Sequence, residues 1–247
     1  MSEGGLGFAV ELSDVQARYG DAASEPVGPP ALTVGQLSLG AGSHVALVGP
    51  SGAGKTTLLR VLGAALRPAS GTVNFEGRDP WTGEARGLRQ VRRQIGFVHQ
   101  DFRLVPQLRV VHNVAAGRLG RWSLGRSLRY ALRLPRAVVE EIHELLERLG
   151  IEDKLFERTD RLSGGQMQRV AVARALFQRP GLILADEPVA SLDAERAREV
   201  LGMLRREAER LGASLVVSLH QEDAAREFFD RRLRLRDGEV VPDGPWL

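Results

Sequence analysis

The sequence of 247 residues contains no cysteine. This absence excludes disulfide bonds, thiolate metal ligands and cysteine nucleophiles, and it fits a reducing compartment. No apolar run approaches the roughly 18 residues of a membrane-spanning helix, and the N-terminal stretch MSEGGLGFAV lacks the basic and apolar regions of a signal peptide. We therefore expect a cytoplasmic chain that is long enough to bury most of its apolar surface in an α/β fold.

Lysine is scarce as well. Of the 34 lysine and arginine side chains, only Lys55 and Lys154 are lysines. Twelve arginines lie from Arg86 to Arg136, where the sequence has a single acid, Asp101. Such a charge run is most often a solvated face, and the alternative is a surface that meets anionic lipid or an acidic partner. We do not expect nucleic-acid binding, because no aromatic residues suited to base stacking accompany these arginines.

The first lysine lies in a glycine-rich loop after the apolar run 45–48, and the loop matches G-x-x-x-x-G-K-[ST] over residues 49–56. Glycines allow a tight turn that points successive N–H groups at phosphate oxygens. The Lys55 charge can then reach the β- and γ-phosphates, and the Thr56 hydroxyl can reach Mg²⁺. A chance glycine-rich turn is the alternative, but the strand before it and the helix-compatible run up to Leu66 give the motif its expected context. The predicted phosphate cradle consists of Gly49, Pro50, Ser51, Gly52, Ala53, Gly54, Lys55, Thr56 and Thr57.

The segments around this loop carry strand patterns. Short alternating or apolar runs at 8–19 and 32–39 favour antiparallel strands, and further strands are expected at 71–77 and 95–98. The sequence therefore predicts an antiparallel β-subdomain near the N-terminus.

The middle of the chain has a different character. From about 101 to 159 strand patterns largely vanish, and apolar residues recur at helical spacing over 137–149. We expect a helical subdomain here, inserted into a single domain that spans 1–247.

A second glycine-containing motif, LSGGQ, occupies residues 162–166. Ser163 can cap a helix that continues to about Gln178, before Pro180. The free N-terminus of that helix could bind an anion, although simple capping is the favoured explanation when these residues are considered alone.

Polar residues then follow two buried strands. The run 182–185 reads LILA and ends in Asp186 and Glu187, and the run 214–219 ends in His220. Open α/β sheets place their chemistry at the carboxyl ends of parallel strands, and two carboxylates there suit Mg²⁺ binding and activation of water. A lone histidine in this position is more often structural than catalytic.

Several of these motifs occur together and in the order of one known family. They are residues 49–56, Gln100, LSGGQ at 162–166, LILADE at 182–187, ASLD at 190–193 and His220. Together they resemble the ATP-binding subunits of ABC transporters, and LSGGQ between a helical insertion and a strand that ends in Asp-Glu is the most specific part. The resemblance covers the chain from about Tyr19 onward. It implies a P-loop NTPase core of the ABC type, with a mainly parallel sheet and with ATP and Mg²⁺ as ligands.

The resemblance also implies a role for each matching residue. Glu187 is expected to deprotonate the attacking water, His220 to hold the γ-phosphate and the water in line, and Lys55 to contact the phosphates. Tyr19 is expected to stack on adenine. The implied magnesium ligands are Thr56, Gln100 and Asp186.

Members of this family work in pairs. The resemblance assigns Ser163, Gly164, Gly165 and Gln166 to the nucleotide that a second copy of the chain holds, in a head-to-tail dimer. It also implies integral membrane permease subunits as partners, an indirect periplasmic-type solute-binding protein, and a peripheral location on the cytoplasmic face of the inner membrane. The helical insertion, with Gln100 as its hinge, is expected to face the permease, and the arginine-rich stretch would then lie at that contact.

A closer likeness concerns phosphonate-import ATPases of the PhnC type. The segments that carry it are GFVHQDFRLV at 96–105, GRLGRWSLGRSL at 117–128, LADEPVASLD at 184–193 and SLHQEDAA at 218–225. We therefore expect the ATPase of a phosphonate importer, with import of another solute or export as the alternative. A non-transport relative in DNA repair or translation is disfavoured, because the chain lacks long coiled-coil insertions and a second cassette.

Overall fold

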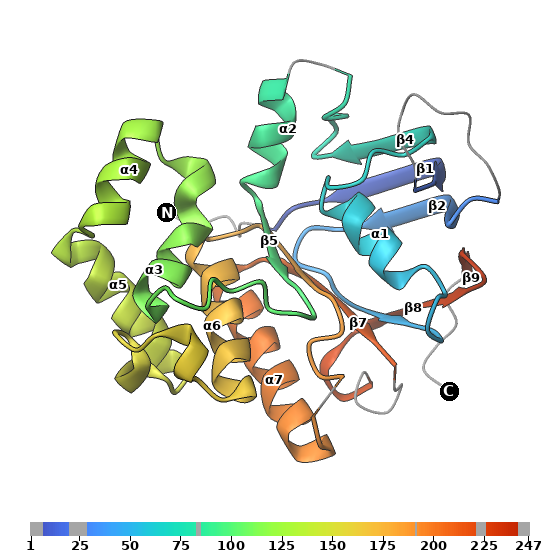
Figure 1. Cartoon of the computed structure of the whole chain (residues 1–247). Coiled ribbons are helices and arrows are strands. Elements are labelled where there is room, and N and C mark those ends of the chain that lie inside the picture. The colour runs from blue at the N-terminus through green and yellow to red at the C-terminus, as the bar shows by residue number, and fades with distance from the viewer. Residues whose placement is uncertain (1–6, 20–28, 83–84, 191, 221–225, 242–247) are drawn as a thin grey trace, which may run out of the picture.

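One mixed β-sheet organises the molecule (Figure 1). The structure is a computed structural model, and it describes residues 7–19, 29–82, 85–190, 192–220 and 226–241. The nine strands in this part of the chain lie in the order β4-β1-β2-β9-β8-β3-β7-β6-β5. Their bounds are β1 Val10–Ala17, β2 Leu32–Leu39, β3 His44–Val48, β4 Ser70–Phe75, β5 Ile95–Val98, β6 Leu182–Ala185, β7 Ser214–Leu219, β8 Arg231–Arg236 and β9 Glu239–Val241.

The half of the sheet that leads to the site is parallel. Strand β3 pairs in parallel with β8 on one side and β7 on the other, and β6 continues the parallel set to β5. The predicted antiparallel subdomain is also present, since β1 pairs antiparallel with both β2 and β4. Both parts of the predicted fold class are confirmed.

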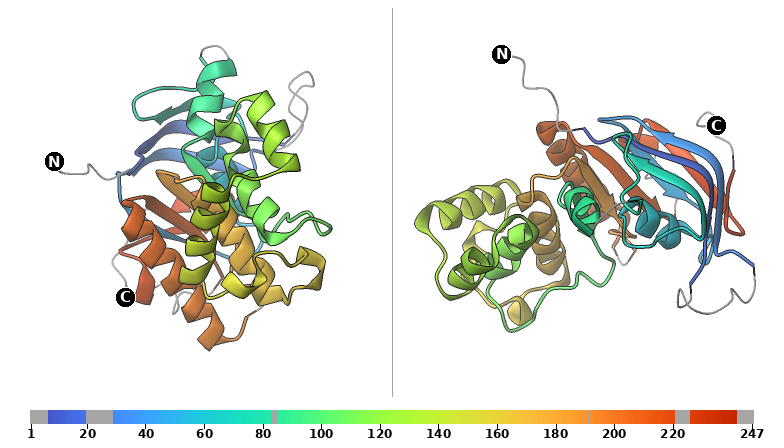
Figure 2. Two further views of the ribbon diagram at one scale, coloured as in Figure 1. Left: turned by 90° about the vertical axis from the view of Figure 1, so that its left-hand side faces the viewer. Right: turned by 90° about the horizontal axis from the view of Figure 1, so that it is seen from above.

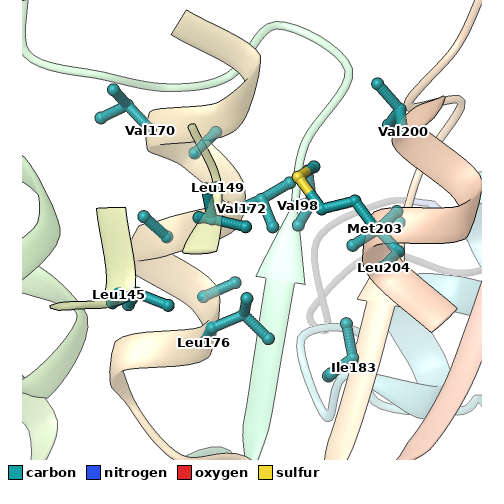
Figure 3. Close-up of a cluster of buried hydrophobic side chains, with 14 of the residues drawn as sticks. Val98, Leu145, Leu149, Val170, Val172, Leu176, Ile183, Val200, Met203 and Leu204 are labelled. Carbon is teal, nitrogen blue, oxygen red and sulfur yellow. The ribbon is translucent and has the colours of Figure 1, made fainter. Parts of the chain in front are cut away.

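The sheet is covered on both faces, and the sequence shows why. Alternate side chains of a strand point to opposite faces. In β3, Ala46 and Val48 belong to one buried cluster, whereas Val45 and Leu47 belong to the other. Figure 3 shows part of the first cluster, where side chains of β5 and β6 meet those of the helices α6 (Gly164–Phe177) and α7 (Ala194–Leu211). This two-sided burial explains the continuous apolar runs in the parallel strands.

The remaining helices fall into two groups. Helix α1 (Lys55–Leu62) packs on the second cluster, and α2 (Ala85–Arg92) precedes β5. The segment from 101 to 159 holds helices and no named strand. Its elements are α3 Val110–Ala115, η1 Ala116–Arg121, α4 Leu124–Leu132, α5 Arg136–Arg148, η2 Glu152–Lys154 and η3 Thr159–Arg161.

This helical insertion lies at the end of the molecule opposite the antiparallel strands (Figures 1 and 2). Its exact boundaries and the single-domain interpretation remain predictions. Within the described ranges, no helix combines the length and the apolar character that crossing a bilayer requires.

The first helix ends earlier than the sequence indicates. We expected it to reach Leu66, but α1 stops at Leu62 and Gly63 caps it. Ala64 then adopts a left-handed φ of 50°, and the Arg92 guanidinium donates two hydrogen bonds to the Ala64 carbonyl, at 3.0 and 2.8 Å. The helix thus ends at a glycine, and a tertiary contact from Arg92 holds the carbonyl just beyond it.

Three parts of the sequence motifs lie outside the described residues. They are the N-terminal residues 1–6, Ser191 within ASLD, and residues 221–225 of SLHQEDAA.

Candidate functional site

The glycine-rich loop connects β3 to α1 at the carboxyl end of the parallel strands. Gly52 and Gly54 have φ of 80° and 97°, which a residue with a side chain rarely adopts. A Cβ atom at Gly54 would also lie 3.2 Å from the Ala31 carbonyl oxygen, whereas one at Gly52 would meet nothing within 4 Å. The loop therefore needs glycine for its turn, and its crest at Gly52 faces open space.

Lys55, the first residue of α1, is almost fully buried, with 3% of its surface exposed. Its ammonium group donates to the carbonyl oxygens of Gly49 and Pro50, at 2.8 and 3.0 Å. It also lies 3.6 Å from a carboxylate oxygen of Glu187. The charge is thus held under the loop and close to the carboxylate that follows β6.

Glu187 meets the second predicted catalytic residue as well. His220 Nε2 lies 2.7 Å from Glu187 Oε1, the same oxygen that Lys55 approaches. The structure therefore brings all three predicted catalytic side chains together, although their positions in the sequence are far apart. Glu187 itself has a left-handed φ of 47°, an uncommon conformation that is typical of functional sites.

Two predicted magnesium ligands are also adjacent. The Thr56 hydroxyl donates to Asp186 Oδ1 at 3.2 Å, which links the start of α1 to the end of β6. Asp186 Oδ1 accepts a second hydrogen bond, at 2.8 Å, from the hydroxyl of Ser218 in β7. The Ser218 oxygen in turn accepts from the Glu187 backbone N–H, at 2.8 Å. One hydroxyl thus orients both acidic residues.

Gln100, the third predicted ligand, lies two residues after β5, which pairs with β6. It is exposed, and the described residues show no hydrogen bond from it to Thr56 or Asp186. The backbone just after it is unusual, since Phe102 and Arg103 both have left-handed φ, 57° and 47°. The carbonyls of these two residues accept hydrogen bonds from Arg174 of α6, at 2.6 and 2.5 Å.

Tyr19 lies beside the loop, as its predicted role requires. Its hydroxyl is 3.0 Å from the Thr57 hydroxyl, and its ring lies 5.5 Å from the Arg60 guanidinium. The side chain remains 54% exposed, so part of its surface is free to contact a ligand. Stacking on adenine stays a prediction.

The LSGGQ segment forms the N-terminus of α6. Ser163 accepts a hydrogen bond from the Gln166 N–H at 3.3 Å, and the Gln166 side chain accepts from the Ser163 N–H at 2.9 Å, which completes a capping box. A Cβ atom at Gly164 or Gly165 would meet nothing within 4 Å. The helix N-terminus is therefore ordered by its own capping residues, and there is free space beside Gly164 and Gly165.

This segment does not meet the glycine-rich loop of the same chain. It lines a cavity of about 820 Å³ together with Gln100, Glu187 and the start of α7. Among the described residues, none of the loop residues 49–57 lines this cavity or forms a hydrogen bond with residues 163–166. Within one chain the loop and residues 163–166 are therefore separate, although Glu187 both approaches Lys55 and lines this cavity.

Sequence reasoning did not find two of the residues that order this site. Ser218 is a buried hydroxyl in an otherwise apolar part of β7, and Arg174 is a charge within the Ala/Val-rich α6. In both cases the signal was a polar residue at a position whose neighbours predict burial. Their partners, however, could be identified only from the structure.

Comparison with known proteins agrees with this geometry. A family model described as ABC transporter matches residues 32–190. The phosphonates import ATP-binding protein PhnC 2 of Pseudomonas aeruginosa is 49% identical over 219 residues, which cover 88% of this chain and 81% of that protein.

Solved structures agree as well. The dimeric structure of MJ0796, a bacterial ABC transporter cassette, superposes with a TM-score of 0.76 at 32% identity and covers 95% of this chain and 97% of the cassette. A second dimeric structure of MJ0796, bound to ADP and Pi, gives a TM-score of 0.74 at 32% identity, with the same coverage. The sequence motifs, the fold and the relatives agree, and this chain therefore belongs to the ABC transporter family of ATP-binding subunits.

Proposed function

We propose that this chain is the ATP-hydrolysing subunit of an importer that takes up phosphonates or a related phosphorus oxyanion. The observation that carries the proposal is the meeting of Lys55, Glu187 and His220 beside the loop and the Thr56–Asp186 pair. The name of the 49% identical relative supports phosphonates as the solute class. Solute recognition itself belongs to partner proteins, so the chain supplies energy and not specificity.

The residues present fit ATP with Mg²⁺. Thr56 and Asp186 offer hard oxygen ligands, and their oxygens are already within hydrogen-bonding distance. Mg²⁺ is commonly bound by one or two protein oxygens together with substrate phosphates, and Thr56 and Asp186 can supply such oxygens. Bound Mg²⁺ would neutralise phosphate charge, and Gln100 would join its ligands after a movement of its segment.

Glu187 is the general base in this proposal. Its carboxylate takes a proton from the water whose oxygen attacks the γ-phosphorus, while the bond to the ADP oxygen breaks on the opposite side. His220, 2.7 Å from this carboxylate, orients it and the water. Lys55 exchanges its contacts with the carbonyls of Gly49 and Pro50 for phosphate oxygens when ATP binds.

A second copy completes each site. Residues 163–166 of one chain contact the γ-phosphate on the loop of the other, because within one chain the two groups lie apart. The dimeric structures of the MJ0796 cassette support the pairing of two chains. ATP then holds the two chains together, and hydrolysis removes γ-phosphate contacts from the interface. Membrane permease subunits would convert this cycle into transport, with a solute-binding protein acting on their other side.

The test of the solute class is growth. A strain of the source organism that lacks this chain should fail to grow with a phosphonate as sole phosphorus source and should grow normally on phosphate. The wild-type chain should restore growth, and the Glu187→Gln variant should not. Unimpaired growth of the deletion strain on phosphonate would contradict the assigned solute.

A further inference from the structure

Helix α4 presents its leucines to the outside. Leu124, Leu128 and Leu132 are 87%, 67% and 84% exposed, although they recur at a spacing of four and therefore share one side of the helix. An ordinary surface helix turns such a stripe toward the core. The α4 stripe is therefore not part of the buried core of the chain.

A different flank of α4 makes the contacts with the protein. Among the side chains of α4 whose burial is described, Ser127 and Tyr130 are partly buried, and the Tyr130 ring meets Trp122 edge to face, at 4.8 Å between centroids. Ser123 caps the first turn by accepting a hydrogen bond from the Arg126 N–H. The helix is thus capped and anchored while its leucine stripe stays open. In Figures 1 and 2 it lies at the outer end of the helical insertion.

Uncompensated positive charge surrounds the stripe. The sequence contains no Asp or Glu from 102 to 139. In the described part of the chain, Arg126, Arg129 and Arg133 form no ion pair with a carboxylate, and all three are exposed. Other arginines of the same run do have carboxylate partners, such as Arg118 with Glu141.

A groove beside α4 adds further arginines. It has a volume of about 500 Å³, is partly formed by Leu124, and is lined by the basic side chains of Arg89, Arg92, Arg93 and Arg121. Arg121 donates to the Arg93 carbonyl at 2.8 Å, so it is held by a neutral acceptor and not by an acid. Burial and the neighbouring charges of Arg118, Arg93 and Arg179 lower the pKa of Arg121. An anion bound in the groove would relieve this repulsion.

We propose that the leucine stripe of α4, its flanking arginines and the adjacent arginine groove form a docking surface for anionic phospholipid. The leucines enter the boundary of the acyl chains, and the guanidinium groups contact headgroup phosphates. We favour lipid over an acidic protein segment because the three leucines lie on a protruding helix. A deformable apolar phase can cover such a helix, whereas protein partners concentrate affinity in a few pocketed anchors.

The test uses the purified full-length chain without nucleotide and vesicles of phosphatidylcholine alone or mixed with phosphatidylglycerol. In flotation assays we expect at least tenfold more bound protein on the mixed vesicles, and a decrease as salt is raised. The double variants Leu128→Ser/Leu132→Ser and Arg126→Glu/Arg129→Glu should each lower binding at least fivefold. The matched controls Leu108→Ser, an exposed leucine outside α4, and Arg206→Glu, an exposed arginine on α7, should bind like the wild type.

Three results would overturn the proposal. Equal binding to both kinds of vesicle would exclude recognition of anionic lipid. Unchanged vesicle binding of the leucine variant would show that electrostatic adsorption alone accounts for the binding. It would exclude insertion of the leucine stripe into the membrane. Loss of copurification with the permease in the leucine variant, while vesicle binding is absent in all forms, would assign this surface to a protein partner. Because the assay needs no ATP, its failure would leave the proposed hydrolysis untouched.

Discussion

At the scale of single residues, the Lys55 ammonium group can bond to the loop carbonyls or to the phosphates of a nucleotide. In the structure its ammonium group bonds to two loop carbonyls and lies near Glu187. These neutral acceptors attract the ammonium group less than a triphosphate would, because phosphate oxygens carry formal negative charge and carbonyl oxygens carry only partial charge. The loop carbonyls therefore position the buried lysine with hydrogen bonds that phosphate oxygens can replace.

We expect Lys55→Ala to weaken nucleotide binding and turnover. Loss of a charge-assisted contact of roughly 1.5–3 kcal/mol corresponds to an affinity about 10- to 150-fold lower. Isothermal titration with ATP, with hydrolysis blocked by omission of Mg²⁺, measures this directly. Wild-type affinity together with wild-type turnover would count against the assigned role.

His99 provides a prediction about pH. Burial, and then the charges of Arg103 and Arg174, lower the pKa of His99 from 6.5 to about 4, and its ring stacks on Phe97 at 4.3 Å. Since the unfolded chain binds the proton more tightly, stability from His99 is complete above about pH 6.5 and is lost as the pH falls toward 4.

The variant His99→Phe keeps an aromatic ring against Phe97 but cannot titrate. Its urea-unfolding free energy should therefore fall less steeply than that of the wild type between pH 6.5 and pH 4. Parallel pH profiles for the two proteins would show that His99 does not carry this dependence.

At the scale of elements, α6 connects the separate groups of the site. Its N-terminus carries the open LSGGQ residues, and Gln168 donates to the carbonyl of Pro188, the residue after Glu187. One turn and a half further on, Arg174 holds the left-handed segment that follows Gln100. A shift of α6 would therefore move both the base and the glutamine.

We expect Arg174→Ala to lower kcat for ATP hydrolysis more than it lowers ATP affinity. The guanidinium group positions the Gln100 segment and is not expected to touch the nucleotide. Arg174→Lys should recover only part of kcat, because one ammonium group cannot reproduce the planar fork that reaches two carbonyls. An equal loss of stability and rate in Arg206→Ala, a solvent-exposed control, would show that the effect is not specific to this contact.

The elements also show how far the sequence alone can predict such a site. Motifs that are local in the chain, such as the turn of the glycine-rich loop and the Ser163 cap, were placed correctly because their geometry is set within a few residues. Contacts across the chain were not predictable. Ser218 lies 32 residues from Asp186, and Arg174 lies 72 residues from Phe102. The end of α1 was missed although Gly63, a local signal for a helix end, lies there.

At the scale of the whole molecule, the predicted ATP-binding residues lie in two places, at the glycine-rich loop and at LSGGQ. The loop, the carboxylates and His220 lie together, while LSGGQ opens into a cavity that Glu187 lines and the loop does not. If ATP binds at the loop as proposed, a monomer with this geometry would leave its γ-phosphate without contacts from LSGGQ. Two copies placed head to tail would supply each loop with the missing helix N-terminus.

The most direct test of ATP-dependent pairing is the mass of the Glu187→Gln variant in solution, measured by light scattering. With Mg²⁺ and ATP the variant should be a stable dimer with twice the mass of one chain, because it binds ATP but lacks the base that hydrolyses it. With ADP it should be a monomer, and adding Lys55→Ala should abolish the ATP-dependent dimer. A variant that stays monomeric at saturating ATP, or that hydrolyses ATP at the wild-type rate, would contradict the account.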